Sequence, residues 1–73
     1  MIEIRLFATL RDGRDKIIKL DPNSFTVAGD VLKHLSICPE DVAIYLINGR
    51  HSNLDAPIKD GDVIAIFPPV GGG

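Results

Sequence analysis

Short apolar runs separated by turn sequences constrain this chain more than any other feature. Residues 2–8 alternate apolar and polar side chains at the start, which predicts a half-buried strand with Ile2, Ile4 and Leu6 on one face and Phe7 on the other. Similar short runs predict strands at residues 16–20, 42–47 and 63–67, and a short edge strand at residues 50–52. The near-continuous apolar run at 42–47 is typical of a strand buried on both faces.

Turn residues lie between these runs. The polar stretch at 11–15 centres on Gly13, so the first two runs are expected to form an antiparallel hairpin. Asn48-Gly49 is a strong two-residue turn signal, and Asp60-Gly61-Asp62 predicts the turn that precedes the last strand. Residues 55–58 are expected to form a loop or a single helical turn.

Helical periodicity is seen in one segment. Val27, Val31, Leu32 and Leu35 form an apolar stripe, and Thr26 is the expected N-cap. Gly29 weakens this helix by about 1 kcal/mol relative to alanine, and the helix should end before Pro39.

This order of elements predicts an α+β fold. The simplest arrangement is a β-grasp (ubiquitin-like) domain, a mixed sheet of four to five strands with one main helix packed on one face. The first and last strands would then lie parallel in the middle of the sheet, a pairing that periodicity alone does not establish.

Size and charge narrow the range of functions. A chain of 73 residues is one domain that buries only about 60% of its unfolded surface, which disfavours a self-sufficient enzyme. The net charge of −2 argues against a nucleic-acid binder and a polybasic membrane segment. There is no apolar run of about 18 residues and no signal peptide, so we expect a soluble, cytoplasmic protein without a membrane partner.

The reactive side chains form no catalytic or metal-binding pattern. The single cysteine, Cys38, excludes an internal disulfide and has no Cys–His–acid arrangement around it. His34, Cys38 and His51 do not have zinc-ligand spacing. The acidic residues Asp55, Asp60 and Asp62 are interpreted as turn chemistry. We therefore expect no catalytic residue, metal site or bound cofactor in this chain.

The C-terminal segment, residues 68–73, carries the functional signal. It follows a domain formed by residues 1–67 and ends in Gly71-Gly72-Gly73, which gives a fold no stability. Two prolines stiffen its start, and six extended residues reach about 20 Å. Such a tail is either a frayed terminus or a flexible arm that threads a narrow tunnel and presents the Gly73 carboxylate to a partner's active site. The arm consists of Pro68, Pro69, Val70, Gly71, Gly72 and Gly73.

A terminal carboxylate needs activation before it reacts. Adenylation with ATP supplies a leaving group, after which sulfur transfer yields a thiocarboxylate and amine attack yields an amide. The chain has neither a G-x-x-x-x-G-K-[ST] nor a G-x-G-x-x-G motif. A partner must therefore use the ATP and Mg.

Several segments together resemble the molybdopterin synthase small subunit (MoaD) family, within the MoaD/ThiS ubiquitin-like sulfur carriers. They are residues 4–11, the Ile47-Asn48-Gly49 stretch, residues 58–63 and, above all, the Phe67-Pro68-Pro69-Val70-Gly71-Gly72-Gly73 terminus. In that family Phe-Pro-Pro is followed by two residues and then Gly-Gly, and Val70 and Gly71 fill those two places. The connection from residue 11 to 16 is shorter than in typical members, which is consistent with a variant carrier, for instance one that serves a tungsten cofactor pathway or another sulfur pathway.

The resemblance implies a β-grasp sulfur carrier that is a non-catalytic subunit. An E1-like adenylating enzyme would activate Gly73, and a sulfurtransferase fed by a cysteine desulfurase would convert it to a thiocarboxylate. The large subunit of molybdopterin synthase, in a heterotetramer, would use that sulfur to make the molybdopterin dithiolene. Phe7, Arg11 and Phe67 match positions with which the family docks its partners, and His51 occupies a third docking position that is usually apolar.

Three alternatives remain. The first alternative is a ubiquitin-like modifier that is joined through Gly73 to lysines. The second is a ThiS-type carrier for thiamine thiazole synthesis, and the third is an interaction module with an inert tail. The ThiS type usually lacks the Pro68-Pro69 element, so it ranks below the modifier.

Overall fold

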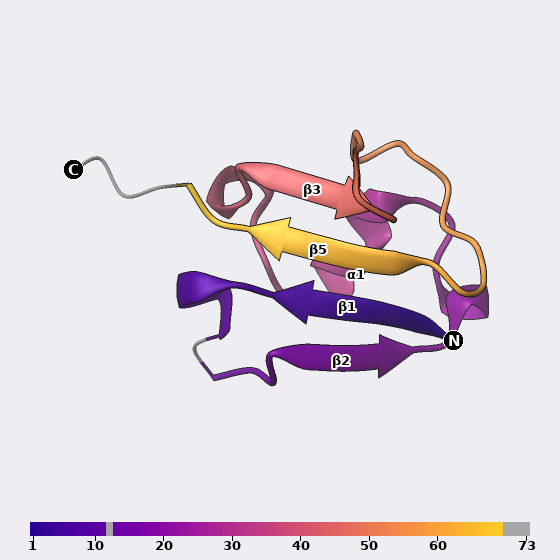
Figure 1. The fold of residues 1–73 in the computed structure, drawn as a ribbon, viewed down its shortest axis with the longest axis horizontal. Coiled ribbons are helices and arrows are strands. Elements are labelled where there is room, and N and C mark those ends of the chain that lie inside the picture. Colours follow the sequence, from indigo (N-terminus) through magenta and orange to yellow (C-terminus); the bar gives the residue numbers. More distant parts are fainter. Residues whose placement is uncertain (12, 70–73) are drawn as a thin grey trace.

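The computed structural model describes residues 1–11 and 13–69, and within them five strands form one mixed sheet. The sheet order is β2-β1-β5-β3-β4, with one α-helix packed against it (Figure 1). The strands are β1 (Ile2–Leu6), β2 (Ile17–Leu20), β3 (Ile44–Ile47), β4 (Arg50–His51) and β5 (Val63–Phe67), and the helix is α1 (Ala28–His34). Short 3-10 helices occupy η1 (Ala8–Arg11), η2 (Pro22–Ser24) and η3 (Pro39–Asp41).

The two terminal strands lie side by side at the centre of the sheet. β1 and β5 are parallel, with Ile4 opposite Ile64 and Leu6 opposite Ile66, while β2 is antiparallel to β1. This pairing confirms the predicted β-grasp architecture and the predicted first hairpin. Position 12, inside that hairpin's connection, lies outside the described residues.

The core fills the space between α1 and one face of the sheet. Alternate residues of β1 and β5 point toward the helix, which places Ile4, Leu6, Ile64 and Ile66 in the fully buried set. The helix contributes a matching apolar stripe of Ala28, Val31 and Leu32. The tyrosine of β3, Tyr45, is also buried, and its hydroxyl donates a 3.0 Å hydrogen bond to the Ala28 carbonyl oxygen. The helix therefore covers one face and leaves the other open.

The start of α1 differs from the sequence prediction. Thr26 is not the N-cap; Val27 occupies that position and has no side-chain acceptor to offer. The carboxylate of Asp30, in the first turn of the helix, instead accepts hydrogen bonds from the Thr26 and Val27 amides at 3.0 and 3.2 Å. The first helical amides are satisfied from outside, since Ala28 N and Gly29 N donate to the Ala56 and Leu54 carbonyls. The helix ends well before Pro39, as predicted.

The prediction that residues 42–47 form a strand buried on both faces is wrong. β3 begins at Ile44, and that residue is 38% exposed, whereas Tyr45 is buried. The helix covers only one face of the sheet, so alternate residues of every strand face away from the core. The continuous apolar run therefore means that β3 has apolar side chains on both faces of the sheet, although the helix covers only one of these faces.

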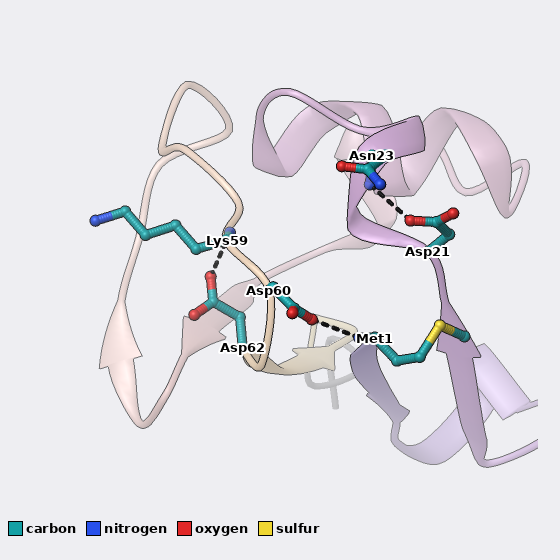
Figure 2. A network of polar contacts seen from close by, with 6 residues as sticks. All are labelled: Met1, Asp21, Asn23, Lys59, Asp60 and Asp62. Carbon is teal, nitrogen blue, oxygen red and sulfur yellow. Dashed lines mark hydrogen bonds and ion pairs between the residues drawn. The ribbon is translucent and has the colours of Figure 1, made fainter.

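Turn chemistry at the far end of the sheet follows the prediction. Asn48 and Gly49 both have positive φ, 52° and 82°, as a tight hairpin turn between β3 and β4 requires. Figure 2 shows the aspartates of the neighbouring loops acting as local acceptors: Asp62 accepts from the Lys59 amide and Asp21 from the Asn23 amide, each at 2.9 Å. Asp60 pairs with the amino group of Met1, which lowers the pKa of that carboxyl.

Candidate functional site

Two phenylalanine side chains meet on the open face of the sheet, at the end from which the tail departs. Phe7 follows β1 and Phe67 ends β5, and because these strands are parallel both residues reach the same end of the sheet (Figure 1). Their rings stack with centroids 4.2 Å apart and planes inclined by 9°. Both side chains remain half-buried without any covering element. The stack is thus a flat apolar surface at the root of the tail.

Arg11 joins this pair. The chain leaves β1 through Ala8, at φ 54°, and η1 turns it back toward the strand end. Arg11 Nε donates a 2.7 Å hydrogen bond to the Leu6 carbonyl oxygen, and its guanidinium carbon lies 5.5 Å from the centroid of the Phe7 ring. This hydrogen bond to the backbone holds the guanidinium group beside the aromatic stack.

His51 lies on the same open face, but not beside the stack. His51 of β4 is opposite Leu46 of β3, and Leu46 is opposite Ala65 of β5. Residues that are paired in this way lie on the same face of the sheet. Two strand spacings therefore separate His51 from β5. The structure brings three of the four predicted docking residues together and places the fourth at the margin.

Two apolar residues on this face were missed by sequence reasoning. Ile44 is opposite Phe67 in the antiparallel register, and Ile17 is opposite Arg5; their side chains are 38% and 47% exposed. The alternation of side chains in β1 and β5 could have identified both residues, because residues opposite each other in paired strands lie on the same face of the sheet. The apolar surface on this face is therefore wider than the stack alone.

Pro68 and Pro69 lead the chain away from β5, half-buried and exposed respectively. A hollow beside them is lined by residues of η1, of the segment after α1 and of η3, including Leu10, Ile37 and Asp41. Arg14 braces this region, since its guanidinium donates to the Leu35 and Leu10 carbonyl oxygens at 3.2 and 3.3 Å. The rest of the predicted arm lies outside the described residues: Val70, Gly71, Gly72 and Gly73, the residue that is predicted to react.

The other reactive side chains are scattered over the structure. Cys38 is exposed at the start of η3, and His34 is exposed and meets Phe25 edge-on. Within residues 1–11 and 13–69, no three His, Cys, Asp or Glu side chains are grouped so that they could hold a metal ion. In the same part of the chain, no helix has the length and apolar character needed to cross a membrane.

Solved structures resemble this chain over nearly its whole length. SAMP1 of Haloferax volcanii is 27% identical and superposes with a TM-score of 0.75, covering 99% of this chain and 98% of its own. A putative molybdopterin converting factor subunit 1 of Pyrococcus furiosus is 28% identical, with a TM-score of 0.69 and coverages of 94% and 97%. A chain in the complex of molybdopterin-converting factor subunits 1 and 2 from Helicobacter pylori is also 28% identical, with a TM-score of 0.60 and coverages of 99% and 97%.

No curated protein matches the chain significantly. The model of the ThiS family, by contrast, matches residues 4–73, nearly the complete sequence. The β-grasp fold, the similarity to molybdopterin converting factor subunit 1 and this match agree with one another. The chain belongs to the ThiS family of small, ubiquitin-like sulfur carriers of the MoaD/ThiS type.

Proposed function

We propose that this protein is the sulfur-carrying small subunit of a molybdopterin synthase. The observation that carries the proposal is the Phe7–Phe67 stack, flanked by Arg11, at the strand end that continues into Pro68 and Pro69. A partner that docks on this surface lies at the root of the arm and can receive Gly73. The similarity to molybdopterin converting factor subunit 1 supports the choice of pathway.

The chemistry takes place on the terminal carboxylate of Gly73. An E1-like enzyme, using ATP and Mg, joins the carboxylate oxygen to the α-phosphorus, and pyrophosphate leaves. The outer sulfur of a persulfide, carried by a sulfurtransferase that a cysteine desulfurase has loaded, then attacks the acyl carbon and displaces AMP. A second thiol cleaves the resulting acyl disulfide, becomes oxidised to a disulfide, and releases the thiocarboxylate. This chain contributes the carboxylate and the docking surface, and the partners contribute the catalytic groups and the nucleotide site.

The thiocarboxylate is then consumed by the large subunit. We propose that the arm enters the large subunit's active site and donates its sulfur to precursor Z for the molybdopterin dithiolene. Glycines suit such a passage, because a backbone without Cβ atoms fits the narrowest channel. The assembly would be a cytoplasmic heterotetramer of two small and two large subunits.

A second candidate is a ubiquitin-like modifier. It is favoured by the similarity to the small archaeal modifier protein 1 of Haloferax volcanii, which covers nearly the whole of both chains. The activation step is shared, but the attacking group is a lysine amine and the product is an amide. The two functions therefore differ in what receives Gly73. The ThiS-type thiazole carrier ranks third, because that type usually lacks the Pro68-Pro69 element.

Intact-mass spectrometry of the protein isolated from its native host tests the proposal. We expect a mass increase that corresponds to one sulfur in place of one oxygen, and co-purification of a molybdopterin-synthase large subunit. A chain lacking Gly72 and Gly73 is the control; it should fold normally, carry no sulfur and fail to support molybdenum cofactor synthesis. Cofactor synthesis that survives this deletion would refute the carrier function, and Gly73 joined to lysines of other proteins would identify a modifier.

A further inference from the structure

A second recess opens on the docking side of the molecule, between the end of β1 and the start of β2. It is lined by Arg5, Leu6, Phe7, Arg11, Lys16 and Ile17. Its volume is about 260 Å³. Small-molecule sites usually enclose roughly 300–1,000 Å³, so this recess is better suited to a side chain of a docked protein.

The apolar residues that line the recess continue the aromatic stack. The Phe7 ring forms part of both, since it stacks on Phe67 and also lines the recess. On the far side, Ile17 of the edge strand is 47% exposed, the most exposed large aliphatic residue within the described strands. Apolar surface therefore extends from β5 across β1 to β2.

The charged residues that line the recess are all basic. Among the described residues that line it, three are basic and none is acidic, although the whole chain has ten acidic and eight basic residues. Arg5 is paired with Glu3, and Arg11 is anchored through Nε to the Leu6 carbonyl oxygen. Within residues 1–11 and 13–69, the Lys16 ammonium and the terminal nitrogens of Arg11 have no ion-pair partner. Two charges are thus available to an incoming group.

We propose that this recess, defined by Phe7, Arg11, Lys16 and Ile17, receives an acidic loop of the partner protein, in which a carboxylate adjoins an apolar side chain. The carboxylate would lie between Arg11 and Lys16, and the apolar side chain would cover Ile17. Charge complementarity of this kind raises the association rate and selects the partner. The inference rests on the proposed function, because the partner is a protein that binds the adjoining aromatic stack and receives the arm.

Two variants test the recess. Lys16→Glu reverses one basic charge of the lining, and Ile17→Ser removes the exposed apolar side chain; neither side chain is part of the buried core. Lys59→Glu is the matched control: it makes the same charge change in the loop before β5, at the opposite end of that strand from Phe67, where its side chain points away from its neighbours (Figure 2). Circular dichroism establishes that each variant is folded.

The probes are the adenylating enzyme and the molybdopterin-synthase large subunit encoded by the same genome. Kd and association rate are measured by surface plasmon resonance at low and physiological salt. We expect Lys16→Glu to weaken binding to at least one of them about tenfold, mainly through a slower association rate that depends less on salt than that of the wild type. Ile17→Ser should weaken binding severalfold through faster dissociation, and Lys59→Glu should bind like the wild type.

The outcomes separate the two proposals. If the wild-type chain binds its partners and both recess variants bind as tightly as Lys59→Glu, the recess proposal is overturned while the proposed function stands. If the wild-type chain binds neither probe, the proposed function fails and the recess proposal fails with it.

Discussion

Asp30, in the first turn of α1, performs the capping role that the sequence suggests for Thr26. Its carboxylate accepts the Thr26 and Val27 amides, and the amide of Thr26 is the main reason that its pKa lies below the ordinary value of 3.8. A depressed carboxyl pKa means that the folded state binds this proton less readily than the unfolded state. The stabilisation is therefore present above pH 4 and is lost as the pH falls through the folded-state pKa.

We expect Asp30→Asn to lower the Tm at neutral pH, because an uncharged amide accepts the two backbone hydrogen bonds less strongly. The difference from the wild type should shrink below about pH 4, where the wild-type carboxyl becomes protonated. Calorimetric scans of both proteins between acidic and neutral pH measure this. A Tm difference that stays constant across that range would contradict the ionic origin of the effect.

The aromatic stack gives a prediction at the same scale. Phe67→Ala removes one ring of the pair, so we expect a loss of about 1–2 kcal/mol in the free energy of unfolding. Partner affinity should fall at least tenfold, since aromatic anchors dominate such interfaces. Urea denaturation and titration calorimetry measure the two effects. Phe25→Leu, in the core, is the control and should lower stability without changing affinity.

At the scale of elements, the turn after β3 is attached to the start of β5. The Asn48 side chain donates to Asp62 Oδ1 and accepts from the Val63 amide, both at 2.9 Å, while its backbone has a φ of 52°. One side chain thus holds the β3–β4 turn against the adjoining strand. Asp62 is the buried partner in this arrangement and also accepts the Lys59 amide.

Asn48→Ala should therefore lower the free energy of unfolding by roughly 2 kcal/mol, because Asp62 Oδ1 and the Val63 amide lose this partner and alanine must adopt a φ of 52°. Asn53→Ala, an exposed asparagine in the following loop, should change it by less than about 0.5 kcal/mol. Urea denaturation of the wild type and the two variants measures these changes in the free energy of unfolding. Equal stabilities would show that Asn48 serves only its own turn.

The elements that could be predicted from the sequence are those set by local patterns. β5 has the predicted bounds, and Asn48-Gly49 forms the predicted turn, because alternation and positive φ are properties of a few neighbouring residues. The cap at Asp30 and the exposed side of β3 depend on how the helix lies on the sheet. The same is true of the Phe7–Phe67 stack, whose members are sixty positions apart and meet only through the parallel pairing of β1 with β5. The resemblance placed both residues on one docking surface, but periodicity could not.

At the scale of the whole molecule, the sheet has two apolar faces with different roles. One is covered by α1 and forms the core, and the other carries Phe7, Phe67, Ile17 and Ile44. The covered face holds the buried core and supplies most of the stability, so the exposed side chains of the open face are available for the proposed partner binding. Docking variants should therefore leave the fold largely intact, whereas variants at the interface of helix and sheet should affect global stability.

Tyr45 reports on that interface. It is the single tyrosine of the chain, its hydroxyl donates to the Ala28 carbonyl oxygen of α1, and burial raises its pKa well above the ordinary value of 10. Since the folded state resists ionisation of this hydroxyl, the stabilisation is complete below pH 10. It declines at higher pH, where the unfolded chain loses the proton and is favoured.

We therefore expect tyrosinate absorbance to appear only together with the loss of secondary structure during an alkaline titration. Tyr45→Phe should cost about 1 kcal/mol at neutral pH through the lost hydrogen bond. Its free energy of unfolding should also fall less steeply above pH 10 than that of the wild type. Parallel ultraviolet absorbance and circular dichroism measure the coupling. Ionisation of Tyr45 near pH 10 in a chain that keeps its full secondary structure would mean that the helix does not seal this side of the core.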